Sequence, residues 1–439
     1  MLSYKLVQGL QNVNLITMSN KRDIYVYADW VGLVEPTLTG ILHAEQLRGK
    51  EIFSFEYTPV WLESSFAQNL DTDLQLYKGL HYLSDNDKSN FGLFTDSSPD
   101  RWGRILMRRK EAAYARQEER KEQNLFETDY LLGVYDEHRM GALRFKLDPN
   151  GQFLNNDKQM ASPPWTSLGE LEGISLKLED EDVITDPDYL KWLSMLVAPG
   201  SSLGGARPKA SVLDSKGHLW IAKFPSKNDL DNVGGWEIVT YEMAIAAGIN
   251  MAESKAQKFN SNAHTFLTKR FDRNNEGRRI HFASAMTLLG YTDGQDYQDG
   301  ASYLELVEFI TREGANVNAD LEELWRRIVF SICVSNTDDH LRNHGFILTD
   351  KGWALSPAYD INPVENGQGL KLNISENDNS LDLNLALEVY EYFRLSEEKA
   401  KEIINQVKKS VANWRGMAQK VGIPKSSQNL KALAFSEAE

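Results

Sequence analysis

The pattern of hydrophobic and polar positions predicts a mixture of strands and helices as far as about residue 273 and mainly helices beyond it. Short apolar runs bounded by polar or Gly-containing turns are typical of strands, whereas apolar residues three and four positions apart are typical of helices. Helices dominate after residue 273, where the pattern leaves room for two short strands. The strands that we predict cover residues 24–30, 141–145, 210–213, 219–224, 266–271, 346–348 and 353–355.

In the first half of the chain, local signals mark one helix start and one linker. Ser98 is a candidate cap, Pro99 suits a first helical turn, and Asp100 favours the positive end of a helix. We therefore predict a helix that begins at Ser98 and runs to about residue 121. Residues 148–165 are rich in Pro, Gly, Asn and Asp, which is typical of a linker.

The helices of the second half are more regular. Residues 237–247 form one candidate, and residues 321–332 carry apolar residues at three- and four-residue spacing. The latter helix leads directly into a polar segment at 335–340. A late helix is predicted to begin at Ser396, a probable cap, and to place Trp414 on its apolar face.

Composition narrows the class of protein. The chain has 439 residues, with 48 Lys and Arg against 63 Asp and Glu, so its formal charge is −15. Domains of roughly 150 residues suggest two or three of them. An acidic chain is a poor general binder of nucleic acid. The single cysteine, Cys333, excludes an internal disulfide and suits a reducing cytoplasm. Since no apolar run approaches the ~20 residues of a membrane helix, we expect a cytoplasmic protein without membrane contact.

The segment D-D-H-L-R-N, residues 338–343, is the most informative for chemistry. Asp338 and Asn343 have the spacing D-x-x-x-x-N, which protein kinases place in their catalytic loop. There the carboxylate accepts the proton of the attacking hydroxyl, and the amide oxygen helps to hold Mg²⁺. Asp339 misses this spacing, so we assign Asp338 as the base. The alternative for this segment is a loop of capping residues that ends a helix.

Two further residues fit the same chemistry. Asp360 follows the two short predicted strands, where a kinase places a metal-binding carboxylate. Lys223 lies in an apolar strand, as does the kinase lysine that binds phosphates. Glu237, 14 residues further on, is its candidate partner, and Glu242 is the rival. The structural alternatives are a turn residue for Asp360 and a lysine at a sheet edge for Lys223.

Other candidate sites are weaker. Residues 200–209 contain two adjacent glycines whose backbone N–H groups can approach phosphate, but taken alone an ordinary hairpin turn explains them better. His340 and His344 have metal-binding spacing on a helix but lack the Glu of a zinc-hydrolase motif. Cys333 lies on an apolar helix face, which favours a buried structural role over a nucleophile.

Taken together, these segments resemble the HipA family, the serine/threonine-kinase toxins of bacterial type II toxin–antitoxin modules. That family shows, in this order, a loop like S-x-x-G-A-x-x-K, a strand lysine, an E/K-R-F-D-R segment, T-D-x-H-x-x-N and P-x-Y-D-I. The likeness covers about residues 22–420, including an N-terminal region around FGLFTDSSPDR. The matching positions here are 202–209, 223, 269–273, 337–343 and 357–361.

The resemblance implies an α+β, two-lobed, protein-kinase-like fold. It divides the chain into a HipA-type N-terminal subdomain at 22–150, a kinase-like N-lobe at 165–272 and a helical C-terminal lobe at 273–439. It also implies ATP and Mg²⁺ as cofactors and phosphoryl transfer to a Ser or Thr of a protein. The known type of target is glutamyl-tRNA synthetase, an aminoacyl-tRNA synthetase.

The resemblance also assigns roles to single residues. Asp338 becomes the proton acceptor, while Asn343 and Asp360 become metal ligands. Residues 204–209 become the phosphate-facing loop, residues 269–271 the hinge that meets adenine, and Asp272 a ribose contact. Ser202 matches the serine whose autophosphorylation ejects the loop and switches the kinase off; a phosphate there adds negative charge where ATP phosphates must sit. The implied nucleotide-site residues are Gly204, Gly205, Ala206, Arg207, Pro208, Lys209, Lys223, Glu237, Lys269, Arg270, Phe271, Asp272, His340, Asn343, Tyr359 and Asp360.

This chain departs from the family pattern in a few positions. About 20 residues precede the family-like start, with a boundary uncertain by a few residues. Asp339 stands where the family usually has Gly, and Arg207 and Pro208 change the loop after Ser202. No catalytic group is lost, so the resemblance implies an active kinase.

The family's usual partner is a small helix-turn-helix antitoxin of the HipB type, so contact with DNA would be indirect. Two rival functions use the same residues: a kinase-fold phosphotransferase for a small molecule, and a non-catalytic nucleotide-binding partner in a repressor complex. The family-like N-terminal region argues against the first. The intact set of chemical groups at Lys223, Asp338, Asn343 and Asp360 argues against the second.

Overall fold

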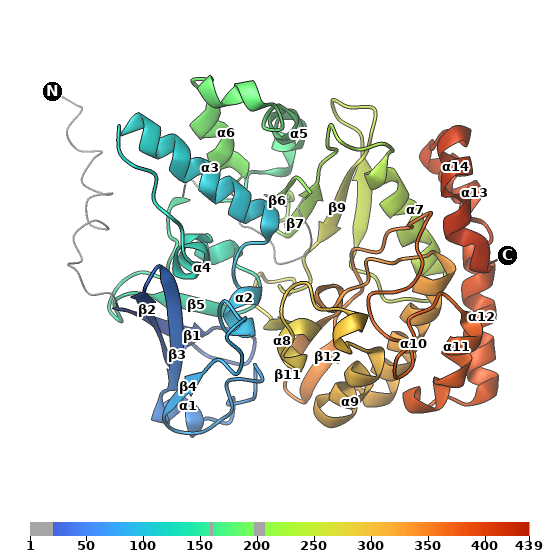
Figure 1. Cartoon of the computed structure of the whole chain (residues 1–439), viewed down its shortest axis with the longest axis horizontal. Helices are drawn as coiled ribbons and strands as arrows, with labels where there is room; N and C mark the ends of the chain where they lie inside the picture. The colour runs from blue at the N-terminus through green and yellow to red at the C-terminus, as the bar shows by residue number, and fades with distance from the viewer. Residues whose placement is uncertain (1–20, 159–160, 197–206, 439) are drawn as a thin grey trace.

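The structure, a computed structural model, describes residues 21–158, 161–196 and 207–438 (Figure 1). An N-terminal sheet lies at one end of the molecule and the C-terminal helices at the other, with a second sheet between and above them (Figure 1). None of the helices in these ranges is long and apolar enough to cross a membrane.

The N-terminal region is built on a five-stranded antiparallel sheet of order β4-β3-β2-β1-β5. In β1, Ile24, Val26 and Ala28 alternate with more exposed residues, so one face is buried, as the period of two predicts. Helices pack beside this sheet and lead toward the rest of the chain. The elements are β1 (Lys21–Ala28), β2 (Thr37–Leu47), β3 (Lys50–Tyr57), α1 (Pro59–Leu62), β4 (Leu80–Tyr82), α2 (Gly92–Asp96), α3 (Arg101–Gln117), α4 (Glu127–Gly133) and β5 (Leu143–Lys146).

The start of α3 corrects the predicted cap. The carboxylate of Asp100, not the hydroxyl of Ser98, accepts the N–H of Gly103 at 2.9 Å. Ser98 instead donates its hydroxyl to the carbonyl of Phe94 at 2.8 Å, because α2 ends directly before it. A carboxylate at this position also meets the positive end of the helix dipole.

The middle region carries a four-stranded antiparallel sheet of order β6-β7-β9-β8. Helix α7 begins four residues before the predicted start, because Asn232 caps it. Gly234 in its first turn packs against the backbone of His264. A Cβ at position 234 would lie 2.2 Å from the carbonyl oxygen of His264, so only glycine fits there. The elements are α5 (Leu168–Lys177), α6 (Tyr189–Leu196), β6 (Lys209–Leu213), β7 (Leu219–Lys223), α7 (Val233–Ala246), β8 (Ser254–Gln257) and β9 (Thr265–Lys269).

The C-terminal region is mainly helical around the buried α10, with a three-stranded sheet of order β10-β11-β12. Strand β10 was not predicted, because three residues are too few for an alternating pattern. Trp414 does not lie on α12, as predicted, but begins α13 after a break. The elements are β10 (Phe282–Ser284), α8 (Ala285–Leu289), α9 (Tyr303–Glu313), α10 (Val317–Cys333), β11 (Gly345–Thr349), β12 (Gly352–Leu355), α11 (Leu383–Glu388), α12 (Glu397–Val411), α13 (Trp414–Val421) and α14 (Lys425–Lys431).

The hydrophobic core crosses the predicted boundaries at 150 and 272. One cluster joins the N-terminal sheet to α7, α10 and α12. A second cluster joins α3 to α5, α6 and one face of the β6-β7-β9 sheet. The three regions are therefore packed together, and α3 is held at a fixed position above the ends of β6 and β7, where the indole N–H of Trp102 donates to the carbonyl of Lys209 at 3.1 Å.

Candidate active site

A buried lysine lies at the centre of the site. Lys223 ends strand β7, and its Nζ donates to Oε1 of Glu237 and to Oδ1 of Asp360, each at 2.6 Å. Glu237 comes from α7, and Asp360 follows β12, so three separate elements meet at one ammonium group. The rival partner, Glu242, is exposed on the same helix. The structure thus brings together the three side chains that the sequence pattern predicts.

Burial and charge shift the pKa values of this cluster in different directions. Burial alone would raise the pKa of the Asp360 carboxyl, but the adjacent Lys223 ammonium outweighs it and the pKa is lowered. For Glu237, burial dominates and the pKa is raised despite Lys223. The two carboxylates hold the pKa of Lys223 above its ordinary value, so the lysine stays charged.

The segment after β12 holds Asp360 in an unusual backbone conformation. Its φ of 56° lies in the left-handed region, which a non-glycine residue rarely adopts. Asn362 supports it, because its Nδ2 donates to Oδ1 of Asp360 at 3.1 Å while its backbone N–H donates to Oδ1 of Asn336 at 3.1 Å. Asn336 precedes the D-D-H-L-R-N segment, so the two loops are tied together. The sequence analysis missed Asn362, which follows an Asp-Ile pair without any motif of its own.

The D-D-H-L-R-N segment forms a loop after α10 that contains a short 3-10 turn at Leu341–Asn343. Nδ2 of Asn343 donates to the backbone carbonyl of Asp338 at 2.9 Å, which fixes the two residues relative to each other. The side chain of Asp338 is exposed to solvent. The surrounding protein removes enough water to raise the pKa of Asp338, and the nearby Asp360 raises it further, while His340 and Lys371 oppose the shift.

The neighbouring Asp339 points into the core instead. Its carboxylate accepts the hydroxyl of Tyr303 at 2.5 Å and lies 3.1 Å from Nε2 of His344. Asp339 is therefore engaged structurally, and its orientation agrees with the choice of Asp338 on spacing. His344 does not share a helix face with His340, since the segment between them is not an α-helix.

Oxygen atoms suited to a cation are present at this site. Oδ1 of Asn343 is buried and has no hydrogen-bond partner within the described part of the chain, and the same is true of Oδ1 of Asn362. Both lie on the loops that carry Asp338 and Asp360. Carboxylate and amide oxygens are the ligands that Mg²⁺ prefers. The described residues contain no cluster of three or more His, Cys, Asp or Glu side chains that could hold a metal, so a cation here would take Asp and Asn ligands with water.

The predicted hinge offers free backbone groups. Phe271 makes no backbone hydrogen bond through its N–H or C=O with any residue that the structure describes. Its ring stacks on Tyr359, with centroids 5.6 Å apart and planes at 29°. The Tyr359 hydroxyl in turn donates to the carbonyl of Arg342 at 2.7 Å, which connects the hinge to the D-D-H-L-R-N loop.

Between Lys223 and Tyr359 the cleft is almost closed. The cavity that these side chains line with Glu237, Thr268 and Asp360 has a volume of about 20 Å³. That is room for about one water molecule. A cavity of this size does not hold a nucleotide.

Asp272, the predicted ribose contact, and Lys269 of the predicted hinge have other partners. Asp272 is fully buried and accepts Nε of Arg270 at 2.8 Å, Nη1 of Arg273 at 2.7 Å and the N–H of Gly141 at 2.8 Å. Burial would raise its pKa, but the two guanidinium groups lower it to about 2. In this arrangement Asp272 cannot contact a ribose, because its oxygens already join the hinge to the N-terminal region. The side chain of Lys269 lies 3.4 Å from the carboxylate of Glu253.

The predicted phosphate loop lies partly outside the described residues. Ser202, Gly204, Gly205 and Ala206 fall in the undescribed stretch 197–206, so their placement stays a prediction. Arg207 pairs with Asp229 at 2.8 Å, and the carbonyl of Pro208 accepts the N–H of Phe224 at 2.9 Å.

Lys209 lies deeper, beside Lys223. The two lysines are register partners across β6 and β7, and Nζ of Lys209 donates to Oδ2 of Asp100 at 2.7 Å. Lys209 also contributes to lowering the pKa of Asp360. The pair with Asp100 links this strand to the start of α3, a contact between residues 109 positions apart that no local pattern predicts.

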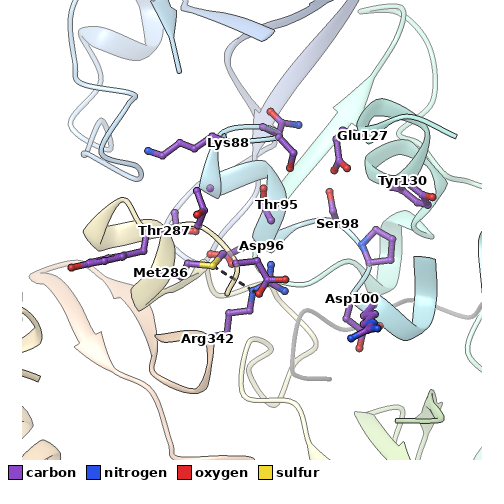
Figure 2. Close-up of a pocket in the computed structure, with 18 of the residues that line it drawn as sticks. Lys88, Thr95, Asp96, Ser98, Asp100, Glu127, Tyr130, Met286, Thr287 and Arg342 are labelled. Atoms are coloured by element: carbon purple, nitrogen blue, oxygen red, sulfur yellow. Dashed lines mark hydrogen bonds and ion pairs between the residues drawn. The ribbon is translucent and has the colours of Figure 1, made fainter. Parts of the chain in front are cut away.

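His340 and Arg342 face a different space. They line a cavity of about 830 Å³ between the D-D-H-L-R-N loop, α2, α3 and α8 (Figure 2). Three arginines of α3 line it as well, at positions 101, 104 and 108. The sequence analysis gave these arginines no role, and their spacing of three and four residues was the one visible signal.

Comparison with known proteins shows which proteins this chain resembles. Residues 201–414 match the family model of the HipA-like C-terminal domain. A Haemophilus influenzae protein, whose name assigns it provisionally as a kinase, is 26% identical over 179 residues, covering 37% of this chain and 52% of that protein. The serine/threonine-protein kinase toxin HipA of Shewanella oneidensis is 25% identical over 147 residues, covering 29% of this chain and 34% of that protein. The chain thus spans about half the length of the first relative.

A solved structure extends the likeness to the N-terminal region. It is HipA of Shewanella oneidensis MR-1, solved in a complex with HipB and operator DNA. The TM-score is 0.63 at 17% sequence identity, and the match covers 94% of this chain and 95% of that chain. This likeness shows a shared fold, which confirms the predicted two-lobed, kinase-like α+β architecture. The HipA-like C-terminal domain at residues 201–414, the relatives and the shared fold together support a HipA-family protein.

Proposed function

We propose that the chain is a Mg-ATP-dependent kinase that phosphorylates a Ser or Thr of a protein and acts as the toxin of a HipA/HipB-like module. The observation that carries this proposal is the contact of Lys223 with both Glu237 and Asp360, beside a loop that holds Asp338 and Asn343 together. The relatives named as kinases support the activity class.

In this proposal the cleft opens and ATP binds with its adenine against the backbone of Phe271. Lys223 contacts the phosphates, and Asn343 and Asp360 hold Mg²⁺, with Asn362 in place to assist. Mg²⁺ supplies charge stabilisation for the phosphates. Asp338 accepts the proton of the substrate hydroxyl as its oxygen bonds to the γ-phosphorus, and ADP leaves with the bridging oxygen. The raised pKa of Asp338 favours this proton transfer near neutral pH.

Partners and location follow from the family. We propose that the chain is cytoplasmic, that a helix-turn-helix antitoxin of the HipB type is its partner, with DNA bound only through it, and that its substrate is a cellular protein. The solved complex of Shewanella oneidensis HipA with HipB and operator DNA supports this assembly. The division at 22–150, 165–272 and 273–439 remains our proposal for the domains. Ser202 is the proposed site of self-phosphorylation.

The test is peptide mass spectrometry after incubation with Mg-ATP. We expect one phosphate on Ser202 in the wild-type chain and none in Ser202→Ala, with ATP binding kept. Ser201→Ala is the matched control, because it removes the adjacent hydroxyl only. Phosphate mainly elsewhere would remove the assignment of Ser202. Absence of Mg-dependent transfer to the chain itself and to every protein of a cell extract would contradict the kinase proposal.

A further inference from the structure

Two loops beside the proposed active site each contain a residue with left-handed backbone. In the 335–343 loop, Ser335 follows α10 with a φ of 49°, and in the 360–367 loop, Asp360 follows β12 with a φ of 56°. Residues other than glycine rarely adopt this conformation, and it persists where surrounding contacts hold it. The contacts that hold these two residues therefore point to a functional constraint on both loops.

Two hydrogen bonds join the loops to each other. Oδ1 of Asn336 accepts the backbone N–H of Asn362 at 3.1 Å. The carbonyl of Ser335 accepts the N–H of Val364 at 3.2 Å. Both bonds start from consecutive residues of the 335–343 loop. They therefore fix this loop against the other at the residues that precede Asp338.

The side chain of Asn336 is also held from the side of α10. The residue is 1% exposed, its backbone N–H donates to the carbonyl of Ser331 at 2.8 Å, and its Nδ2 lies 3.4 Å from Oγ of Ser331. A buried amide loses its hydration, so it needs partners for both of its ends. For Asn336 these partners come from α10 and from the 360–367 loop, so one side chain connects the loop to the helix.

The proposed base and a proposed cation ligand lie at the two ends of this connection. Asp338 follows Asn336 by two residues, and Asp360 precedes Asn362 by two residues. Nδ2 of Asn362 donates to Oδ1 of Asp360 at 3.1 Å, so the connection reaches the carboxylate itself. Burial and then the charge of Asp360 raise the pKa of Asp338, which agrees with two carboxyl groups close enough to interact.

We propose that Asn336 is a positioning residue that sets the separation between the side chains of Asp338 and Asp360. This inference rests on the proposed function and adds one residue to its mechanism. Each carboxylate has support of its own, since Lys223 donates to Asp360 and Nδ2 of Asn343 donates to the backbone of Asp338. The amide of Asn336 supplies the link between the two.

Loss of this amide should reduce the rate of phosphoryl transfer more than the binding of ATP. In Asn336→Ala the N–H of Asn362 loses its acceptor, while the contacts of Lys223 and Asn343 remain. A misplacement of about 1 Å between reacting groups costs ~10²-fold in rate. We therefore expect kcat to fall by ~10²-fold, with KM for ATP nearly unchanged.

A second variant changes the same separation without removing the amide. A Cβ at position 367 would lie 2.3 Å from Cγ2 of Thr337, the residue after Asn336, and 3.1 and 3.3 Å from its Oγ1 and Cβ. Thr is stiff at its first side-chain torsion, so rotation does not relieve this contact. Gly367→Ala must therefore push the loops apart. Gly367 is only partly buried, so the variant is expected to fold and to lose kcat as Asn336→Ala does.

Two further variants serve as matched controls. Ser331→Ala removes the partner of Nδ2 of Asn336 and leaves the bond from Asn362 to Oδ1 in place. Asn373→Ala removes another buried amide, whose Nδ2 donates to the carbonyl of Tyr297 at 3.0 Å, outside both loops. The second control measures what the loss of a buried amide does to the fold in general.

Three measurements are made on each full-length chain. Mg-dependent ATP turnover gives kcat and KM, thermal unfolding gives stability, and hydrogen–deuterium exchange without nucleotide reports a peptide covering residues 361–366. This peptide should exchange faster in Asn336→Ala, because the N–H of Asn362 is freed. Asn373→Ala should lower the unfolding temperature as Asn336→Ala does but keep the wild-type kcat. Ser331→Ala should keep both the slow exchange and the wild-type kcat.

Several results would overturn the proposal. An equal fall of kcat in Asn373→Ala would make Asn336 a purely structural residue. Unchanged kcat in Asn336→Ala and Gly367→Ala, a rise of KM at constant kcat, or exchange as slow as in the wild type would contradict the link. Absence of turnover by the wild type would instead contradict the proposed function, and faster exchange in Asn336→Ala would then mean a link between the loops without a role in positioning a base.

Discussion

Cationic side chains are buried and paired in the cleft around Lys223, whereas, in the part of the chain that the structure describes, some of those in the cavity beside α3 are exposed and unpaired. In the cleft, one ammonium is buried between two carboxylates in a space of about 20 Å³. In the cavity of about 830 Å³, Arg104 has its pair while Arg101 and Arg108 face open space. The D-D-H-L-R-N loop separates the two, with Asp338 linked electrostatically to both Asp360 and His340.

This difference indicates two physical roles. A buried, fully paired charge cluster is fixed before any ligand arrives, which is the condition for electrostatic catalysis. The charges of such a cluster are paired with each other, so a charged ligand must separate Lys223 from Glu237 or Asp360 before it can bind there. Hydrated, unpaired arginines need no such exchange, and they bind anions weakly but adaptably. The predictions below are arranged to test this contrast, beginning with the largest effect.

The largest effect is expected at Asp338. In Asp338→Asn the loop keeps its shape but loses its proton acceptor, so phosphoryl transfer should fall by about 10²–10⁴-fold. Binding of Mg-ATP should change little. Both quantities are measured by ATP turnover and calorimetric titration.

Asp339→Asn is the matched comparison for this variant. Its side chain is buried against Tyr303 and His344, so the change should lower the unfolding temperature, whereas Asp338→Asn should not. Transfer at the wild-type rate in Asp338→Asn would exclude Asp338 as the base.

Removal of the buried cation should destabilise the fold. Lys223→Met leaves the buried Glu237 without its cation and removes the cation beside Asp360, and the loss of one member of such a pair costs about 3–5 kcal/mol. Urea unfolding measures this free energy. Lys223 lowers the pKa of Asp360, so in the wild type this stabilisation is present above the ordinary carboxyl pKa and is lost as pH falls. The gap between wild type and Lys223→Met should therefore narrow at acidic pH; a gap that widens would contradict this assignment.

A pH-dependent effect of intermediate size is expected at Asp272. Its pKa is lowered from 3.8 to about 2, so its pairing stabilises the fold above pH 3.8 and is lost as pH falls toward 2. The difference corresponds to about 2 kcal/mol. Unfolding free energies between these pH values should decline more steeply in the wild type than in Asp272→Asn. Equal slopes would mean that Asp272 is not ionised in its contacts with Arg270 and Arg273.

The smallest effect is expected in the cavity. Arg104→Gln removes a pair with Glu127 whose side chains are 24% and 19% exposed, so solvent screens it. The loss should be about 0.5–1 kcal/mol in urea unfolding. Arg104→Gln and Lys223→Met each remove one cation. If the two regions differ as described, Arg104→Gln should lower the free energy of unfolding less than Lys223→Met does. A loss as large as that of Lys223→Met would erase the distinction.

Sequence patterns predicted the parts of this site that depend on local order. The spacing of Asp338 and Asn343 corresponds to a real side-chain to backbone bond, and the cap at Ser396 and the apolar face of the α10 helix were found correctly. The pairing of Lys223 with Glu237 also followed from a strand and a helix close together in sequence.

Other parts depended on contacts between distant segments. The Asp100–Lys209 pair, the burial of Asp272 against Gly141, and the cavity between α3 and the D-D-H-L-R-N loop each join residues more than 100 positions apart. No periodicity or capping signal encodes such contacts. Asp272 illustrates the consequence, since its motif suggested a ribose contact while its neighbours give it a structural role.

The central claim, that the cleft around Lys223 is the nucleotide site, is tested most directly by hydrogen–deuterium exchange with Mg²⁺ and a non-hydrolysable ATP analogue. The free N–H of Phe271 and the strands around Lys223 should become protected on binding. Peptides covering residues 269–273 and 207–224 should therefore exchange more slowly, while residues 101–108 of α3 should not change. Protection confined to residues 88–108, or none at any analogue concentration, would contradict the account.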